Sequence, residues 1–300
     1  MNSKQKHAFY KAFVPDCFLN EGEPYRFFLH SKELFLDFVT FLENSEESGA
    51  AACLVELLDI RDQEWRADEQ DATRLARCLP KMVNLSTLIL KTHGFNHPAI
   101  IAALCSSGLP SLETLHLNMD ELDTENISIL RGAVPKPGSL KDVRFLSDED
   151  SSSGPELTKD YPQEYTDAVM WLLAGSAETI ETLIVRSLPT TKSFARTSVR
   201  LQFPNLSVLK TFGHWFKQSP SLAQPHLKLI HLEFWIPDAS PDPGCSCSCD
   251  VELLRLLGRC FPSLKELAFE ALDWPYPYVS PLTMSAMRYQ TLKSLCSYAL

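Results

Sequence analysis

Basic side chains recur at two equivalent positions of a short leucine-containing phrase that this chain repeats. They are Arg61, Lys91, Arg144, Arg186 and Lys210. Arginine and lysine bind carboxylate and phosphate groups through charge-assisted hydrogen bonds, so this pattern predicts recognition of an acidic or phosphorylated protein segment. Solvated strand positions with scattered charges explain the same residues without any partner, because the outward face of a strand is normally polar.

The same two positions also carry residue types that are common in protein interfaces. Arginine and aromatic side chains are enriched at binding hot spots. A local basic row is more conspicuous on this chain because its net charge is −10. We therefore predict a partner-binding face that consists of Arg61, Lys91, His116, Arg144, Arg186, Lys210, Phe212, His231, Glu233 and Tyr298.

The phrase itself is a leucine, two variable residues, a second leucine, one variable residue, and a third leucine or a substitute. Side chains alternate across a strand, so the second and third leucines point to one side and their neighbours to the other. A strand with one apolar face needs neighbours to bury that face, so the copies should stack into a parallel sheet. The nine copies span 55–60, 85–90, 112–117, 140–145, 180–185, 206–211, 227–232, 264–269 and 292–297, and their first residues lie 21 to 40 apart.

The segments between the phrases must connect parallel strands, which usually requires a helix. Apolar residues at helical spacing predict helices over 71–82, 98–107, 126–134, 165–174, 251–261 and 280–289. The intervals around Leu206 and Leu227 are too short for a helix, so loops or a single 3₁₀ turn are expected there. Ahead of the first phrase, a strand is expected at 24–30 and an amphipathic helix at 32–43.

Phrases of this type are characteristic of leucine-rich repeats, whose period is about 20–29 residues. The predicted fold is an α/β leucine-rich-repeat solenoid with irregular repeats: a curved parallel sheet with helices and loops on its convex side. The order of strand, helix, the phrase at 55–60 and the helix containing 74–79 resembles fungal F-box/leucine-rich-repeat proteins over residues 24–300. The resemblance implies a non-catalytic protein-protein recognition module, the substrate-binding part of a subunit of a cullin ubiquitin ligase.

The resemblance covers the leucine-rich-repeat part and includes no clear F-box. An F-box typically opens with a Leu-Pro-x-Glu-Leu-Leu phrase, and the nearest match, 31–36, lacks the proline. Residues 1–23 are expected to be an N-terminal extension, and 24–300 the repeat domain. An adaptor of a cullin ligase is the expected partner if an F-box lies upstream, in a longer chain. The alternative function is a leucine-rich-repeat scaffold or regulator with no link to a ligase.

Metal-binding and catalytic patterns are weak in this sequence. Cys245, Cys247 and Cys249 offer soft ligands, but structural zinc sites typically space their cysteines more widely, so an unligated loop is the default. His93 and His97 flank Gly94, which favours a loop over a shared helix face. The chain has no Gly-x-Ser-x-Gly elbow, Walker phosphate loop or Gly-x-Gly-x-x-Gly motif. We therefore predict no enzyme, no metal and no cofactor.

Charge and hydropathy exclude two further classes of partner. A net charge of −10 argues against nucleic acid, which requires a basic footprint. No run of 18 apolar residues is present, so no membrane span is predicted. The first residues are polar and lack the apolar core of a secretory signal, which predicts a cytoplasmic or nuclear protein with reduced cysteines.

Overall fold

The computed structural model describes eleven segments of the chain, which fall into two compact units. The first unit contains the described residues up to 146 together with 162–176, and the second contains those from 177 onward. The described segments are 26–44, 52–62, 64–107, 109–119, 127–132, 138–146, 162–185, 203–212, 228–236, 264–271 and 284–288.

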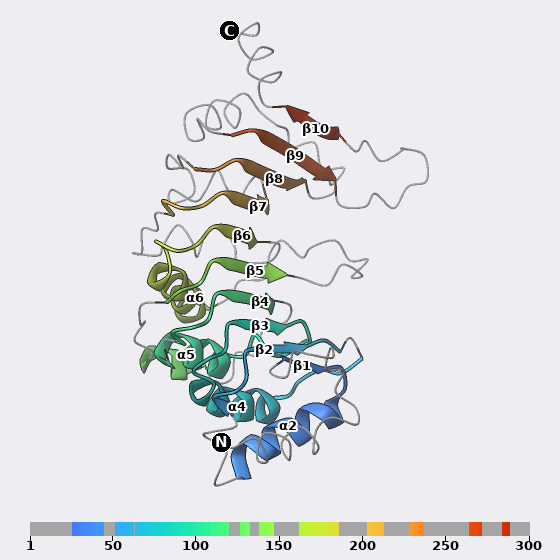
Figure 1. The fold of residues 1–300 in the computed structure, drawn as a ribbon, viewed down its shortest axis with the longest axis vertical. Coiled ribbons are helices and arrows are strands. Elements are labelled where there is room, and N and C mark those ends of the chain that lie inside the picture. The colour runs from blue at the N-terminus through green and yellow to red at the C-terminus, as the bar shows by residue number, and fades with distance from the viewer. Residues whose placement is uncertain are drawn as a thin grey trace, which may run out of the picture. The chain divides into compact units, whose positions relative to one another are not determined.

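In the first unit, five parallel strands form a sheet in chain order (Figure 1). Because the second leucines of consecutive phrases pair across the sheet, Leu58 lies beside Leu88, and Leu88 beside Leu115. All three side chains are fully buried, as expected for the apolar side of an alternating strand. The strands are β1 (Arg26–Leu29), β2 (Leu57–Ile60), β3 (Thr87–Leu90), β4 (Thr114–Asn118) and β5 (Asp142–Leu146).

Helices alternate with these strands, which confirms the predicted α/β class. Four predicted helices are present, and of the segment predicted as a helix at 126–134 the described residues, 127–132, form a 3₁₀ helix instead. No helix within the described segments is long and apolar enough to cross a membrane. The helical elements are α2 (Lys32–Asn44), α4 (Glu69–Cys78) with η1 (Leu79–Lys81), α5 (Pro98–Ser107), η2 (Ile127–Gly132) and α6 (Gln163–Gly175).

The boundaries of α4 follow from its sequence. Asp68 caps the N-terminus by accepting a hydrogen bond from the Asp71 amide at 2.9 Å, and the Asp71 carboxylate accepts one from the Asp68 amide. This reciprocal arrangement satisfies two amides that the first turn leaves without partners. Pro80 has no amide hydrogen and so cannot continue the helix, which tightens into the 3₁₀ turn η1.

Short polar side chains beside the first leucine of a phrase join it to the preceding phrase. Asn84 donates to the carbonyl of Cys53 at 2.6 Å, and Asn205 donates to the carbonyl of Glu178 at 2.5 Å. Ser86 and Ser207 make equivalent bonds one residue after the leucine, each at 3.0 Å. We call these side chains the polar ladder. The two serine hydroxyls bind the carbonyls of Glu56 and Glu181, which also accept backbone amides at the start of β3 and of β7, so the polar ladder reinforces the main-chain pairing there.

An aromatic cluster packs α2 onto the loops that follow β2 and β3. The ring of Phe35 lies 4.9 Å from that of Trp65 and 5.4 Å from that of Phe95, and the Trp65 and Phe95 rings meet edge-on at 5.5 Å. Phe35 and Phe95 are almost completely buried. Tilted and edge-on pairs of this kind add to the free energy gained by burial. The segment 26–44 is therefore part of the core of the first unit.

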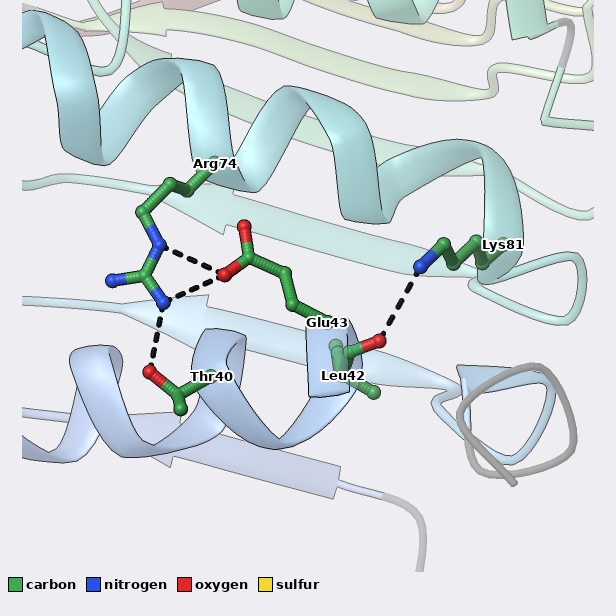
Figure 2. Close-up of polar contacts among 5 residues, drawn as sticks. All are labelled: Thr40, Leu42, Glu43, Arg74 and Lys81. Carbon is green, nitrogen blue, oxygen red and sulfur yellow. Dashed lines mark hydrogen bonds and ion pairs between the residues drawn. The ribbon is translucent and has the colours of Figure 1, made fainter. Parts of the chain in front are cut away.

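Polar contacts also hold α2 against α4 (Figure 2). Arg74 donates two hydrogen bonds to Oε2 of Glu43, at 3.0 and 2.7 Å, and a third to Oγ1 of Thr40 at 2.7 Å. Farther along, Lys81 donates to the carbonyl of Leu42 at 3.3 Å. The Arg74 and Glu43 side chains are largely shielded from solvent, so this ion pair is screened less than a surface pair.

Replacing Arg74 with alanine should loosen α2 selectively. Losing the charge-assisted bonds should cost about 1 kcal/mol, because the partly shielded Glu43 carboxylate then has no partner for its charge. Amide hydrogen exchange should accelerate in α2 and remain unchanged in β4 and β5. Arg77→Ala is the matched control, since Arg77 is an exposed arginine in the same helix. Equal effects of the two substitutions would show that the contacts in Figure 2 do not hold α2 in place.

In the second unit, four parallel strands are followed by one antiparallel strand. The helix predicted at 280–289 is wrong, because 284–288 forms a strand whose Met284 lies beside Phe269. Pairing with the neighbouring strand satisfies the backbone there in place of a helix. The helix predicted at 251–261 and the phrase at 292–297 lie outside the described residues. The strands are β6 (Thr182–Val185), β7 (Val208–Phe212), β8 (His231–Ile236), β9 (Glu266–Ala271) and β10 (Met284–Arg288).

The predicted phrase at 227–232 is displaced by two residues. Leu232 pairs with Leu209, which is the second leucine of the preceding phrase, and Leu229 is completely buried. Ile230, which was predicted to be buried in the second position, is 41% exposed. The phrase therefore consists of Leu229, Leu232 and Phe234. A shift by two residues preserves the alternation of sides, so the sequence pattern alone does not distinguish the two registers.

Candidate protein-binding face

The parallel register of the first unit arranges the residues opposite the leucines in three rows across the sheet. Neighbouring strands are about 4.8 Å apart, so adjacent members of a row are within side-chain reach. The N-terminal row is Leu57, Thr87, Thr114 and Asp142, and the middle row is Asp59, Ile89, His116 and Arg144. The C-terminal row is Arg61, Lys91, Asn118 and Leu146; its members follow the middle row by two residues along each strand.

Exposure differs along this face. Arg61 and Lys91 are exposed, and Thr114, His116 and Arg144 are partly exposed. Asp59 and Asn118 are buried, at 1% and 5%. Nδ2 of the Asn118 side chain donates to the carbonyl of Lys91 at 3.0 Å, which fixes this side chain beside the end of β3. Part of this face is therefore buried, and its cationic side chains lie at two places: at the ends of β2 and β3, and on β5.

On β2, Asp59 and Arg61 form a clasp along one strand. Arg61 donates from Nε to Oδ1 at 2.7 Å, and its Nη2 lies 2.5 Å from Oδ2. The hydrogen bond to Asp59 raises the pKa of the Arg61 guanidinium. Because the carboxylate is buried and the Arg61 side chain is 54% exposed, Asp59 fixes the guanidinium while leaving part of it open to solvent.

On β5, Asp142 lies between two groups that can stabilise its negative charge. Arg144 donates to it from Nε at 2.9 Å and from Nη2 at 2.7 Å. Nε2 of His116 lies 3.8 Å from Oδ2, which is an ion-pair distance longer than a hydrogen bond. Burial alone would raise the pKa of Asp142, but the interactions with His116 and Arg144 outweigh it and lower this pKa to about 2.

Asp142 was not among the residues predicted from the sequence. Its signal is nevertheless present, because an aspartate two residues before an arginine on a strand lies on the same side. Asp59 and Arg61 have the same spacing. The two predicted arginines that the structure describes are therefore each neutralised in part by a carboxylate on their own strand.

The predicted face residues of the second unit lie on β7 and β8, and two of them change rows. Lys210 pairs with Glu233, and His231 pairs with Val208. Counting from the phrase at 227–232 predicts His231 in the middle row and Glu233 in the C-terminal row. Both predictions are wrong by one row, because β8 is shifted by two residues. Phe212 pairs with Trp235. This register sets an acidic residue on the strand next to Lys210. Arg186 and Tyr298 lie outside the described residues.

The two histidines considered as metal ligands, His93 and His97, take part in hydrogen bonds within the fold. His97 is buried, and its Nδ1 accepts a hydrogen bond from the amide of Ala99 at the start of α5, at 3.1 Å. The carbonyl of His93 accepts from the amide of Ala67 at 2.9 Å. No group of three or more potential metal ligands occurs among the described residues. The loop with Cys245, Cys247 and Cys249 lies outside them.

Two buried cysteines of the first unit are poor nucleophiles. Burial raises the pKa of Cys78 to about 11 and that of Cys105 to about 12. Both thiols therefore stay protonated at neutral pH, whereas the thiolate is the reactive form.

Comparison with known proteins adds no relative to these observations. No protein-family model matches the chain, and no curated protein matches its sequence.

Proposed function

We propose that the chain is a leucine-rich-repeat protein that recognises a partner protein with the face opposite its leucines. The observation that carries this proposal is the common register of β2 to β5, in which equivalent leucines are buried side by side. Stacked repeats of this kind create an extended surface from residues that are distant in the sequence. The module is non-catalytic in this proposal, and Arg61, Lys91, His116 and Arg144 are its contact residues in the first unit.

Site-specific cross-linking tests which face binds. A photoreactive amino acid at Thr114, in the N-terminal row, should capture a partner in cells that express the full chain. The same group at Gln70, an exposed residue of α4, should not capture it. Adding Arg144→Glu to the Thr114 probe should reduce the cross-linked product, because it reverses a charge one strand away. Equal capture through Gln70, or an unchanged yield of cross-linked product after Arg144→Glu, would contradict the proposed face.

A substrate receptor of a cullin ubiquitin ligase is the specific function that the resemblance to F-box/leucine-rich-repeat proteins favours. A receptor must contact the ligase adaptor as well as its substrate. Affinity purification of the full-length protein should then recover an adaptor and a cullin together with the cross-linked partner. Recovery of the partner without either ligase component would favour the alternative, a scaffold or regulator that uses the same face.

A further inference from the structure

Arg61 and Lys91 occupy neighbouring positions in the C-terminal row, on β2 and β3. The register of these strands places Ile60 beside Leu90, and the Lys91 amide donates to the Ile60 carbonyl at 2.9 Å, so Arg61 and Lys91 follow as neighbours. Both are exposed, while Ile60 and Leu90 before them are completely buried. Two cationic side chains therefore leave the sheet on the same side, about 4.8 Å apart at the backbone.

The clasp with Asp59 gives this pair its geometry. Asp59 binds Nε and Nη2 of Arg61, which leaves the Nη1 edge of the guanidinium without a bond to this carboxylate. A guanidinium held by a buried carboxylate loses less conformational entropy when it binds a ligand than a free one. Oδ1 of Asp62 accepts from the amides of Glu64 and Trp65 in the following loop, and among the described residues no hydrogen bond or ion pair joins this carboxylate to Arg61 or Lys91.

The backbone spacing of Arg61 and Lys91 favours one compact anion over a row of carboxylates. On an extended acidic peptide, carboxylates that face the same way are about 6.6 Å apart, which does not match strands about 4.8 Å apart. One phosphoryl group carries two negative charges and three acceptor oxygens, so it can accept from Arg61 and Lys91 together. The pair thus fits a single compact dianion better than a row of carboxylates.

We propose that Arg61 and Lys91 bind the phosphoryl group of a phosphorylated serine or threonine in the partner protein. This inference rests on the proposed function, since it assigns a chemical class to the segment that the face recognises. Arg144 does not belong to this phosphate site, because it lies two strands beyond β3 and holds Asp142. The phosphate site is thus confined to β2 and β3.

Nuclear magnetic resonance on the full chain tests the proposal with a minimal probe. Titration with N-acetyl-phosphoserine amide at constant ionic strength should shift the amide signals of 60–62 and 90–92 in a saturable way. N-acetylglutamate amide should bind at least tenfold more weakly. Lys91→Glu should weaken phosphoserine binding at least tenfold, whereas Arg77→Glu, the same charge change on exposed α4, should leave it unchanged. Lys91 is exposed, so its replacement should not disturb folding.

A second variant removes Arg61 without leaving the buried Asp59 carboxylate charged and without its partner. Asp59→Asn combined with Arg61→Gln removes both charges of the clasp, and it should also abolish the shifts at 60–62 and 90–92. Absent shifts in the parent protein, shifts elsewhere, or equal binding of the glutamate probe would each overturn the phosphate site. If cross-linking through Thr114 persists in that case, only this inference fails. Loss of the cross-link itself would instead remove the proposed function.

Discussion

Gly94→Ala is expected to lower the free energy of unfolding of the first unit by about 3 kcal/mol or more. Gly94 has φ of +88°, in the left-handed region that side chains with a Cβ rarely adopt. A Cβ at this position would also lie 2.1 Å from the carbonyl oxygen of Ala67, a backbone atom in the neighbouring loop. The Ala67 amide donates to the His93 carbonyl, which pairs these two loops as in a short parallel bridge. Moving the Ala67 backbone away from the new Cβ would disrupt this hydrogen bond.

Urea unfolding followed by circular dichroism would measure the loss. Val83→Ala removes methyl groups from a residue that is 42% exposed, and it should change stability by less than about 0.5 kcal/mol. Gly94→Asn separates the two causes, because asparagine tolerates positive φ but still carries a Cβ. It should be as harmful as alanine if the close approach to Ala67 dominates. Near-normal stability of the alanine variant would mean that these two loops do not pack as described.

Asp142→Asn should cost about 2 kcal/mol of stability at neutral pH. The pKa of Asp142 falls from 3.8 to about 2 on folding, and each pKa unit corresponds to about 1.4 kcal/mol; because the side chain is partly exposed, solvent screening reduces the total to about 2 kcal/mol. A depressed carboxylate pKa stabilises the folded state above the unfolded pKa, and this stabilisation is lost as pH falls through the folded pKa. The difference between parent and variant should therefore be constant above about pH 5 and should shrink between pH 3.8 and about 2.

Glu113→Gln provides the matched control for Asp142. Glu113 and Lys141 form an ion pair at 2.7 Å between the neighbouring strands, but both side chains are about half exposed, at 49% and 48%. Solvent screening should limit its loss to about 0.5 kcal/mol or less. Combining Asp142→Asn with Arg144→Met would measure the coupling of that pair. A cost for Asp142→Asn that did not change with pH would show that charge is not the source of its contribution.

The sequence predicted much of the fold because leucines mark the buried side of each strand. The register of Leu58, Leu88 and Leu115 follows from equal spacing within each phrase, and the helices between them follow from the need to connect parallel strands. The pattern did not resolve β8, because Leu227 and Leu229 lie two residues apart and either can start a phrase with the same alternation. The segment 284–288 has too few apolar residues to distinguish a helix from a strand that pairs with β9.

The candidate face was predicted less well, because exposure and pairing depend on neighbours that the sequence does not specify. Alternation placed Arg61 and Arg144 opposite the leucines, but it did not show that Asp59 and Asp142 bind them. The position of Ile89 opposite the leucines also did not predict that its side chain is only 8% exposed. Within the first unit, the basic row predicted from the sequence therefore consists of two arginines, each bound by a carboxylate, and one exposed lysine.

The polar ladder has a consequence for how the chain accommodates segments of unequal length. Asn84, Ser86, Asn205 and Ser207 each attach the beginning of a strand to a main-chain carbonyl within the previous phrase or two residues before it. These bonds attach the start of β3 and of β7 directly to the preceding repeat, independently of the length of the crossover between them. Residues can be gained or lost within a crossover without displacing the next strand. With β8 in its observed register, the first residues of phrases on paired parallel strands lie 23 to 35 residues apart, and this unequal spacing is compatible with a constant register.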